Sequence, residues 1–467
     1  MTMQNTAEIL SNSHINFGTS GARGLVEHFT QEVCAAFTVN FITALQQQGH
    51  IVERLALGMD LRPSSPAMVA ACAGAAKAMG VAVDFYGVLP TPALALQAMR
   101  QECPAIMITG SHIPFDRNGL KFYRPDGEIT KADEPLILSS NVALPVFSPE
   151  SPQASNEAVN TYLNYLRSHF PEQCLAGWKI GVYEHSAAGR DITTVLLRQL
   201  GAEVISLGRS DRFVPIDTEA VSAEDIAQGK AWSQAHGFDA ILSTDGDGDR
   251  PLVADETGEW LRGDLLGLIC ARYLQIDALA VPVSCNTAIE TSGAFAEVVR
   301  TRIGSPYVIE AMQLLSERHT KVAGFEANGG FLLGELPTRD ALLPALALFS
   351  AAQEAGVSVS TWVRQLPQRF TASDRITEVP TEKSLALIQA WQANPELAQQ
   401  ALPLPASIDT INTTDGLRLS LANAEIVHLR PSGNAPELRC YVETADPDRA
   451  LSLVKQILTS IKETIHS

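Results

Sequence analysis

The stretch FDAILSTDGDGDR, residues 238–250, places a short apolar run directly before three aspartates that alternate with glycines. The run FDAILST predicts a β-strand, and the Ala-rich segment before it, residues 223–236, predicts a helix. The same alternation of short apolar runs with Ala- and Leu-rich helical segments recurs along most of the chain. It is the sequence form of βαβ units, so the expected fold class is α/β with a largely parallel or mixed sheet.

The carboxylates of Asp245, Asp247 and Asp249 can surround one hard divalent cation, because the glycines between them let the backbone turn tightly. Magnesium is the ion that this pattern favours. An EF-hand needs glycine at the sixth loop position and a helix before the loop, whereas this chain has Arg250 and a strand there. A plain acidic turn is the remaining alternative, although a turn does not need three aspartates beside an arginine.

A second loop, TGSHIP at residues 109–114, also follows a predicted strand. Gly110 leaves room for a phosphate or substrate to approach, so Ser111 is a candidate nucleophile. Its neighbour His112 is expected to point away from it, which argues against a Ser-His-Asp triad. Lys121, in the apolar run LKFY, is a candidate base if its pKa is lowered.

A third loop, RPSGNAP at residues 430–436, follows the predicted strand IVHL. The guanidinium of Arg430, the hydroxyl of Ser432, the amide of Asn434 and the N–H groups at Gly433 suit a bound phosphate. The alternative is a plain Gly-Asn-Pro turn with an exposed arginine, and this loop alone does not decide between them.

Two further loops are weaker signals. In GFEANGG, residues 324–330, Glu326 and Asn328 can bind vicinal sugar hydroxyls, although a structural turn is the simpler interpretation of this loop alone. The loop FGTSGARG, residues 17–24, carries Arg23. It matches neither GxxxxGK[ST] nor GxGxxG, so neither an ATP P-loop nor a dinucleotide site is indicated.

The length of 467 residues suits several domains. The final hundred residues differ from the rest, with predicted strands at 426–429 and 437–442 and an amphipathic helix at 450–464. We predict four domains, each with one of the main loops: residues 1–150 (serine loop), 151–257 (metal loop), 258–370 (sugar loop) and 371–467 (phosphate loop).

Charge and cysteine usage exclude some classes of protein. Lys and Arg number 34 against 52 Asp and Glu, a net charge of −18, so nucleic-acid binding is disfavoured. Seven scattered cysteines without a CxxC pair favour free thiols in a reducing cytoplasm. The N-terminus has no signal-peptide pattern, and no apolar run is long enough to span a membrane.

The chain resembles the α-D-phosphohexomutase superfamily, the phosphomannomutases and phosphoglucomutases. The resemblance is carried by TGSHIP with NGLK (residues 118–121), DGDGDR and RPSGNAP, which occur in this order. The resemblance covers nearly the whole chain. It implies three similar α/β mixed-sheet domains and a smaller C-terminal α+β domain around a central cleft. It also implies an isomerase-class phosphotransferase that acts through a phosphoserine and a hexose 1,6-bisphosphate, with Mg²⁺ as cofactor and the bisphosphate as activator.

Carried over by position, the resemblance assigns each candidate residue a role. The phosphorylated serine falls on Ser111, beside His112. The metal ligands fall on Asp245, Asp247 and Asp249 with the phosphoryl oxygen on Ser111. Arg23 and Arg250 match active-site arginines, and Lys121 matches the proposed general base. Glu326 and Asn328 fall in the sugar-binding loop, and the loop for the non-reacting phosphate comprises Arg430, Ser432, Gly433 and Asn434.

The chain departs from the family pattern at three positions: Ile113 replaces Asn, Gly330 replaces His and Asn434 replaces Thr. These departures bear on sugar preference and phosphate contacts. The form EANGG is more similar to bacterial phosphomannomutases than to phosphoglucosamine mutases, so the favoured reaction interconverts mannose 6-phosphate and mannose 1-phosphate. That activity ordinarily feeds GDP-mannose synthesis.

Three alternatives stay open. A phosphoglucomutase or dual-specificity phosphohexomutase has the same loops, and a metal-dependent sugar phosphatase would use an aspartate of DGDGDR as nucleophile. A non-catalytic phosphosugar-binding protein is disfavoured, because the serine, lysine and metal loops are all retained. The sequence does not indicate an oligomeric state.

Overall fold

Three sheets of the computed structural model repeat one order of four strands, β4-β3-β5-β6, β9-β8-β10-β11 and β13-β12-β14-β15. In each set the first three strands run parallel and the last is antiparallel. This repetition, with the antiparallel fourth sheet described below, confirms the expected fold class of three similar mixed-sheet α/β units and one α+β unit. The structure describes residues 5–18, 20–432 and 436–466.

The first unit extends its sheet to seven strands by adding β1 and β2 beside β6, and by pairing β7 with β6. Thr30 caps α2, because its Oγ1 accepts a hydrogen bond from the N–H of Val33 at 3.3 Å. The strands are β1 Asn16–Phe17, β2 Gly21–Leu25, β3 Arg54–Met59, β4 Ala82–Val88, β5 Ala105–Ile108, β6 Arg117–Arg124 and β7 Gly127–Glu128. The helices are α1 Thr6–Ser11, η1 Val26–His28, α2 Gln31–Gln47, α3 Ser65–Ala78, α4 Thr91–Arg100 and α5 Asp133–Ser139.

The second unit has a four-stranded sheet. Its helix over residues 223–236 is confirmed; it ends at Gly237, whose φ of 62° suits glycine at a helix C-terminus. The elements are α6 Glu157–Arg167, β8 Lys179–Tyr183, α7 Arg190–Gln199, β9 Glu203–Leu207, α8 Ala223–His236, β10 Ala240–Thr244 and β11 Pro251–Ala254.

The third unit adds β16 to the shared four-strand order through an antiparallel pairing with β15. Its strands are β12 Ala278–Pro282, β13 Glu297–Thr301, β14 Val322–Phe325, β15 Phe331–Leu333 and β16 Leu336–Asp340. Its helices are α9 Gly263–Tyr273, α10 Ala288–Thr291, α11 Ser305–Ser316, α12 Leu342–Ala355 and α13 Val359–Val363.

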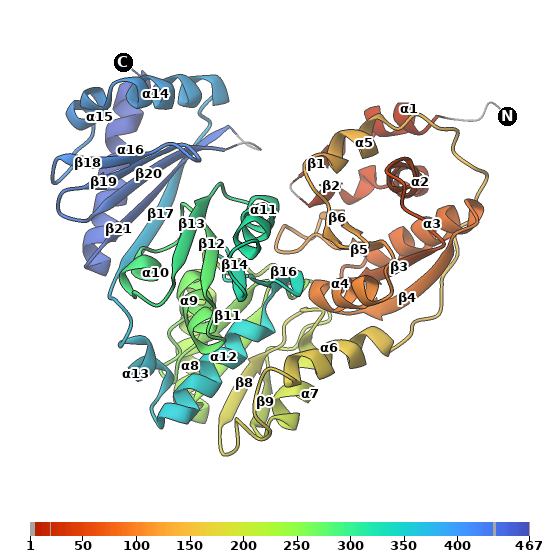
Figure 1. Cartoon of the computed structure of the whole chain (residues 1–467), viewed down its shortest axis with the longest axis horizontal. Helices are drawn as coiled ribbons and strands as arrows, with labels where there is room; N and C mark the ends of the chain where they lie inside the picture. Colours follow the sequence, from red (N-terminus) through yellow and green to blue (C-terminus); the bar gives the residue numbers. More distant parts are fainter. Residues whose placement is uncertain (1–4, 19, 433–435, 467) are drawn as a thin grey trace.

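The fourth unit is a five-stranded antiparallel sheet in the order β17-β21-β20-β19-β18, the α+β arrangement expected at the C-terminus. Its elements are β17 Phe370–Thr377, α14 Thr381–Ala393, α15 Pro395–Ala401, β18 Ile408–Asn412, β19 Leu417–Leu421, β20 Ile426–Pro431, β21 Glu437–Thr444 and α16 Pro447–His466. In Figure 1 this unit and the first unit lie at opposite sides of the molecule, with the second and third units joining them.

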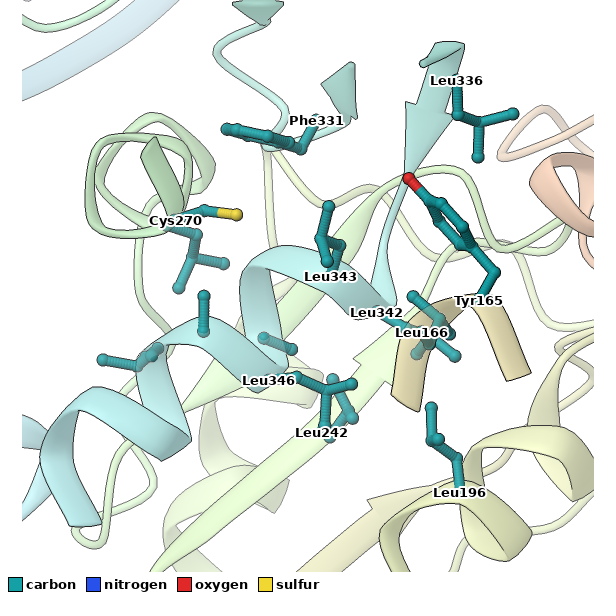
Figure 2. Packing of buried hydrophobic residues seen from close by; sticks show 14 of the residues in the cluster. Tyr165, Leu166, Leu196, Leu242, Cys270, Phe331, Leu336, Leu342, Leu343 and Leu346 are labelled. Carbon is teal, nitrogen blue, oxygen red and sulfur yellow. The ribbon is translucent and has the colours of Figure 1, made fainter. Parts of the chain in front are cut away.

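The hydrophobic core is not divided into one cluster per unit. The largest cluster runs continuously through the first, second and third units, while the fourth unit has its own cluster. Figure 2 shows Leu342, Leu343 and Leu346 of α12 close to side chains of α6 and β10. The loops at the ends of these sheets are therefore held at fixed positions relative to one another, because they rest on one packed core.

None of the helices among the described residues combines the length and the apolar run that crossing a bilayer requires.

Candidate active site

The serine, metal and sugar loops each follow the same strand of the repeated order: β5, β10 and β14. Polar groups that follow the C-terminal ends of parallel strands collect at one edge of a sheet, where α/β proteins bind ligands. Asp245 and Glu326 come directly after β10 and β14, and Ser111 is the third residue after β5. The repeated topology thus gives each unit one loop of the site.

The serine loop and the metal loop meet at a short hydrogen bond. The hydroxyl of Ser111 donates to Oδ2 of Asp245 at 2.6 Å, and both side chains are buried. Ser111 has a φ of 52°, a left-handed conformation that a non-glycine residue adopts at some cost. Its N–H donates to Oγ1 of Thr109 at 2.8 Å, which holds this unusual turn.

The prediction that His112 points away from Ser111 is wrong. Nδ1 of His112 lies 3.3 Å from Oγ of Ser111, because the left-handed turn at Ser111 brings consecutive side chains together. Burial, with the positive charges of Arg250 and Arg23, lowers the pKa of His112 to about 3, so the imidazole is neutral at pH 7. Among the described residues no carboxylate accepts a hydrogen bond from its ring, so the site is still no Ser-His-Asp triad.

The three aspartates form one buried cluster. Oxygen atoms of Asp245, Asp247 and Asp249 lie within 4.8 Å of one another. Oδ1 of Asp247 and Oδ1 of Asp249 are buried without a hydrogen-bond partner in the described part of the chain. Two unpartnered buried carboxylate oxygens beside a third carboxylate are what a hard divalent cation needs as ligands, so the cluster fits such an ion.

Lys121 lies in this cluster, with Nζ at 2.5 Å from Oδ2 of Asp247 and 2.7 Å from Oδ2 of Asp249. Burial acts to lower the pKa of Lys121, but the attraction of Asp247 and Asp249 outweighs it, and the pKa is raised. The lowered pKa that the sequence interpretation required of a base is therefore not found in this structure. Lys121 carries a proton here.

The two arginines predicted for the reacting phosphoryl group differ in how they are held. Arg250 lies with Nε 3.6 Å from Oδ1 of Asp249. Arg23 lies on β2, which pairs with β1 and β6. Its guanidinium makes no hydrogen bond or ion pair with any residue that the structure describes. Burial and the nearby charges of Arg250 and Arg339 lower the pKa of Arg23. A cation held among other cations in a buried place stabilises an added anion strongly.

In the sugar loop, Glu326 and Asn328 are both buried. Nδ2 of Asn328 lies 3.5 Å from Oε2 of Glu326. Oδ1 of Asn328 accepts a hydrogen bond from the N–H of Gly330 at 2.9 Å. The carboxylate and the amide thus form one polar patch. Beside it, at Ala327, lies a cavity of about 380 Å³ lined by the second, third and fourth units.

The phosphate loop follows β20, as predicted. Nε of Arg430 donates to Oδ2 of Asp415 at 3.0 Å, and the same oxygen accepts from the N–H of Ile303 in the third unit at 3.0 Å. Ser432 is buried, and its N–H donates to the carbonyl of Glu437. The predicted residues Gly433 and Asn434 lie outside the described residues.

Sequence reasoning missed two buried arginines. Arg62, just after β3, donates to the carbonyl oxygens of Ser111, Ile113, Pro114 and Arg117 at 2.6–3.0 Å and is paired with Asp60 at 3.2 Å. Its guanidinium also stacks on Phe213 of the second unit, 3.8 Å from the ring centroid. The available signal for Arg62 was the pair of charged residues, Asp60 and Arg62, that follows the apolar run at residues 55–59. The second arginine, Arg339 on β16, gave no local signal.

Comparison with known families matches four consecutive segments of the chain. They are phosphoglucomutase/phosphomannomutase alpha/beta/alpha domain I at residues 14–141, domain II at 160–258, domain III at 262–370 and the C-terminal domain at 377–460.

Full-length relatives and solved structures agree with this match. The chain is 50% identical to a phosphomannomutase of Salmonella muenchen over 99% of this chain and 98% of the relative. It is 43% identical to one of Sinorhizobium fredii (96% and 99%). Its fold matches a phosphoglucomutase/phosphomannomutase family protein of Burkholderia thailandensis at 19% identity, with a TM-score of 0.77 over 95% of this chain and 96% of the other. Four matched domains and these full-length relatives show that the chain belongs to the phosphoglucomutase/phosphomannomutase family.

Proposed function

We propose that this chain is a phosphomannomutase that interconverts mannose 6-phosphate and mannose 1-phosphate. The observation that carries the chemistry is the hydrogen bond between Ser111 and Asp245, which joins a strained serine to a carboxylate cluster across two units. The identity of 50% with a phosphomannomutase over nearly the whole chain supports the choice of mannose. The assignment places the enzyme in the isomerase class.

In this proposal the oxygen of Ser111 carries the transferred phosphoryl group. Phosphoryl transfer depends on alignment and charge stabilisation more than on covalent help from the protein. Arg23 and Arg250 offset the charge of the group. Asp245, Asp247 and Asp249 would hold Mg²⁺, which when bound neutralises phosphoryl charge.

Lys121 exchanges the proton of the sugar hydroxyl. Its ammonium donates a proton to the sugar oxygen when that oxygen loses its phosphoryl group, and the neutral amine accepts the proton in the opposite direction. The raised pKa of Lys121 suits the donor role. Neutral His112, beside the hydroxyl of Ser111, is a hydrogen-bond partner that adds no charge to the site.

The phosphate that does not react binds to Arg430 and Ser432, with Gly433 and Asn434 completing the loop in the family pattern. Glu326 and Asn328 bind sugar hydroxyls from the neighbouring unit. After the first transfer, the hexose 1,6-bisphosphate must exchange its two ends before it returns a phosphoryl group to Ser111. A trace of the bisphosphate activates the enzyme, because it can phosphorylate Ser111.

The test is phosphorus NMR of the purified full chain with Mg²⁺ and a trace of hexose 1,6-bisphosphate. Mannose 1-phosphate and glucose 1-phosphate are supplied in separate tubes, and Ser111→Ala serves as the control. We expect a 6-phosphate resonance that grows faster with mannose 1-phosphate. Intact-mass measurement should show one phosphoryl group on the wild-type chain after exposure to the bisphosphate, and none on Ser111→Ala.

Each other outcome identifies a different protein. A faster reaction with glucose 1-phosphate would make the chain a phosphoglucomutase, and similar rates would make it a dual-specificity enzyme. Inorganic phosphate as the only product would indicate the metal-dependent phosphatase. No reaction with either sugar would contradict an enzymatic role on these substrates and favour a phosphosugar-binding protein.

A further inference from the structure

Arg339 links the sugar loop to the metal loop. It lies on β16, and only 5% of its surface is exposed. Nη1 donates to Oε2 of Glu326 at 3.0 Å, and Nη2 donates to Oδ2 of Asp249 at 2.9 Å. One guanidinium thus holds two carboxylates that belong to different units, and its planar fork fixes the angle between them.

The arginine occupies only one oxygen of each carboxylate. Oδ2 of Asp249 accepts from Arg339 and Lys121, while Oδ1 has no hydrogen-bond partner in the described part of the chain. Oε2 of Glu326 accepts from Arg339 and Asn328, and no described residue donates to Oε1. Nε of Arg250 lies 3.6 Å from Oδ1 of Asp249, beyond hydrogen-bond distance. The second oxygen of each carboxylate can therefore still accept another ligand, in an orientation that Arg339 sets.

The neighbouring chain is shaped to admit this arginine. A Cβ atom at Gly330 would lie 2.8 Å from Cδ and 2.9 Å from Cγ of Arg339, and 2.9 Å from the carbonyl oxygen of Asp249. Only glycine leaves room there for the arginine stem.

We infer that Arg339 is a positioning residue that sets Oδ1 of Asp249 for the metal and Oε1 of Glu326 for the sugar. One side chain then determines both the affinity for a divalent ion and the affinity for the phosphosugar. The sugar half of this inference rests on the proposed function, whereas the metal half depends only on the aspartate cluster.

The test uses direct binding, so that turnover does not enter. In a Ser111→Ala background, Mn²⁺ and mannose 1-phosphate are titrated calorimetrically into the unchanged chain, Arg339→Gln, Arg339→Lys and Arg209→Gln. Arg209 is the matched control, because it also bridges two carboxylates, Glu184 at 3.0 Å and Asp191 at 2.7 Å. We expect Arg339→Gln to lower the affinities for Mn²⁺ and for mannose 1-phosphate by about tenfold or more, because the loss of a residue that orients metal ligands typically has an effect of this size. Arg209→Gln should change neither.

Arg339→Lys separates position from charge. Lysine keeps the charge but lacks the fork, so it should restore at most one of the two affinities. If Arg339→Gln does not fold, Arg339→Lys alone tests the inference. Wild-type affinity of Arg339→Lys for both ligands would overturn it. A lower melting temperature with both affinities unchanged, or the loss of one affinity only in Arg339→Gln, would also overturn it. If the unchanged chain binds neither mannose 1-phosphate nor glucose 1-phosphate, the proposed function fails. The Mn²⁺ titration then still tests whether Arg339 positions Asp249 for the metal.

Discussion

The hydroxyl of Ser111 lies 2.6 Å from Oδ2 of Asp245, and this contact crosses from the first unit of the chain to the second. Neither residue reaches the other by local folding, because 134 positions separate them. The contact exists because both residues follow the equivalent strand of a repeated sheet, and because these units share one core. Packing far from the site therefore controls the geometry at Ser111.

Replacing Ser111 by alanine should abolish turnover. The oxygen that carries the phosphoryl group is removed, while every contact to the sugar remains, so kcat should fall by at least about a thousandfold. The rate is measured by phosphorus NMR, and substrate binding by calorimetry. Ser139→Ala, at an exposed site on α5, is the control and should keep the wild-type rate. Wild-type turnover in Ser111→Ala would contradict the assignment.

Replacing Arg62 by lysine should lower kcat with little change in KM. The guanidinium donates to four carbonyl oxygens around the serine loop, and an ammonium group cannot reproduce that planar set. Losing two or three of these bonds costs about 2–4 kcal/mol, part of it in stability and part in the placement of Ser111.

Steady-state kinetics and thermal melting measure the effect of Arg62→Lys. Arg54→Lys is the control. Arg54 lies at the start of β3, the strand that precedes Arg62, and it forms an ion pair with Asp84 at the surface. If kcat stays at its wild-type value while the melting temperature falls, Arg62 has a purely structural role.

The sequence predicts the local parts of this site better than the contacts between them. The helix at residues 223–236 was predicted at its observed bounds, and the run FDAILST was predicted as the strand that the structure has as β10, because apolar periodicity and turn residues are local signals. The serine and the aspartates were found for the same reason, since each follows such a strand.

What the sequence could not show depends on which strands become neighbours. Arg62 reaches the serine loop because β3 lies beside β5, and Arg339 reaches Asp249 from a hairpin strand of another unit. The raised pKa of Lys121 likewise follows from two aspartates of the second unit. The contacts of Arg339 and the pKa of Lys121 are set by tertiary packing and carry no local sequence signal.

Replacing Arg430 by alanine should chiefly raise KM for the phosphosugar. The guanidinium is expected to bind the phosphate that does not react, so its contribution is similar in the ground state and the transition state. A lost charged hydrogen bond of about 1.5–3 kcal/mol corresponds to a rise of about tenfold to a hundredfold. Arg375→Ala is a surface control, because Arg375 lies on β17, which β21 separates from β20. A variant with the wild-type KM would count against a phosphate role for Arg430.

Asp340, next to Arg339, should make the unfolding free energy depend on pH. Its Oδ1 accepts from the N–H groups of Leu342 and Leu343, and its Oδ2 accepts from the hydroxyl of Tyr162 at 2.8 Å. Burial raises the pKa of Asp340 from 3.8 to about 6. Between these two values the folded chain binds more protons than the unfolded chain, so stability is highest below pH 4 and is lost as the pH rises through 6.

Asp340→Asn removes this titration but keeps an oxygen for the backbone donors, while its amide can donate to Tyr162. Relative to Asp340→Asn, the wild-type chain should therefore lose about 3 kcal/mol of unfolding free energy between a pH well below 4 and a pH well above 6, the product of the pKa difference and 1.36 kcal/mol per unit. Urea unfolding of both proteins at several pH values measures that difference, in which the titration of the other groups cancels. If the difference between wild type and Asp340→Asn does not change with pH, Asp340 is ionised over the whole range, and its three hydrogen bonds rather than its burial determine its pKa.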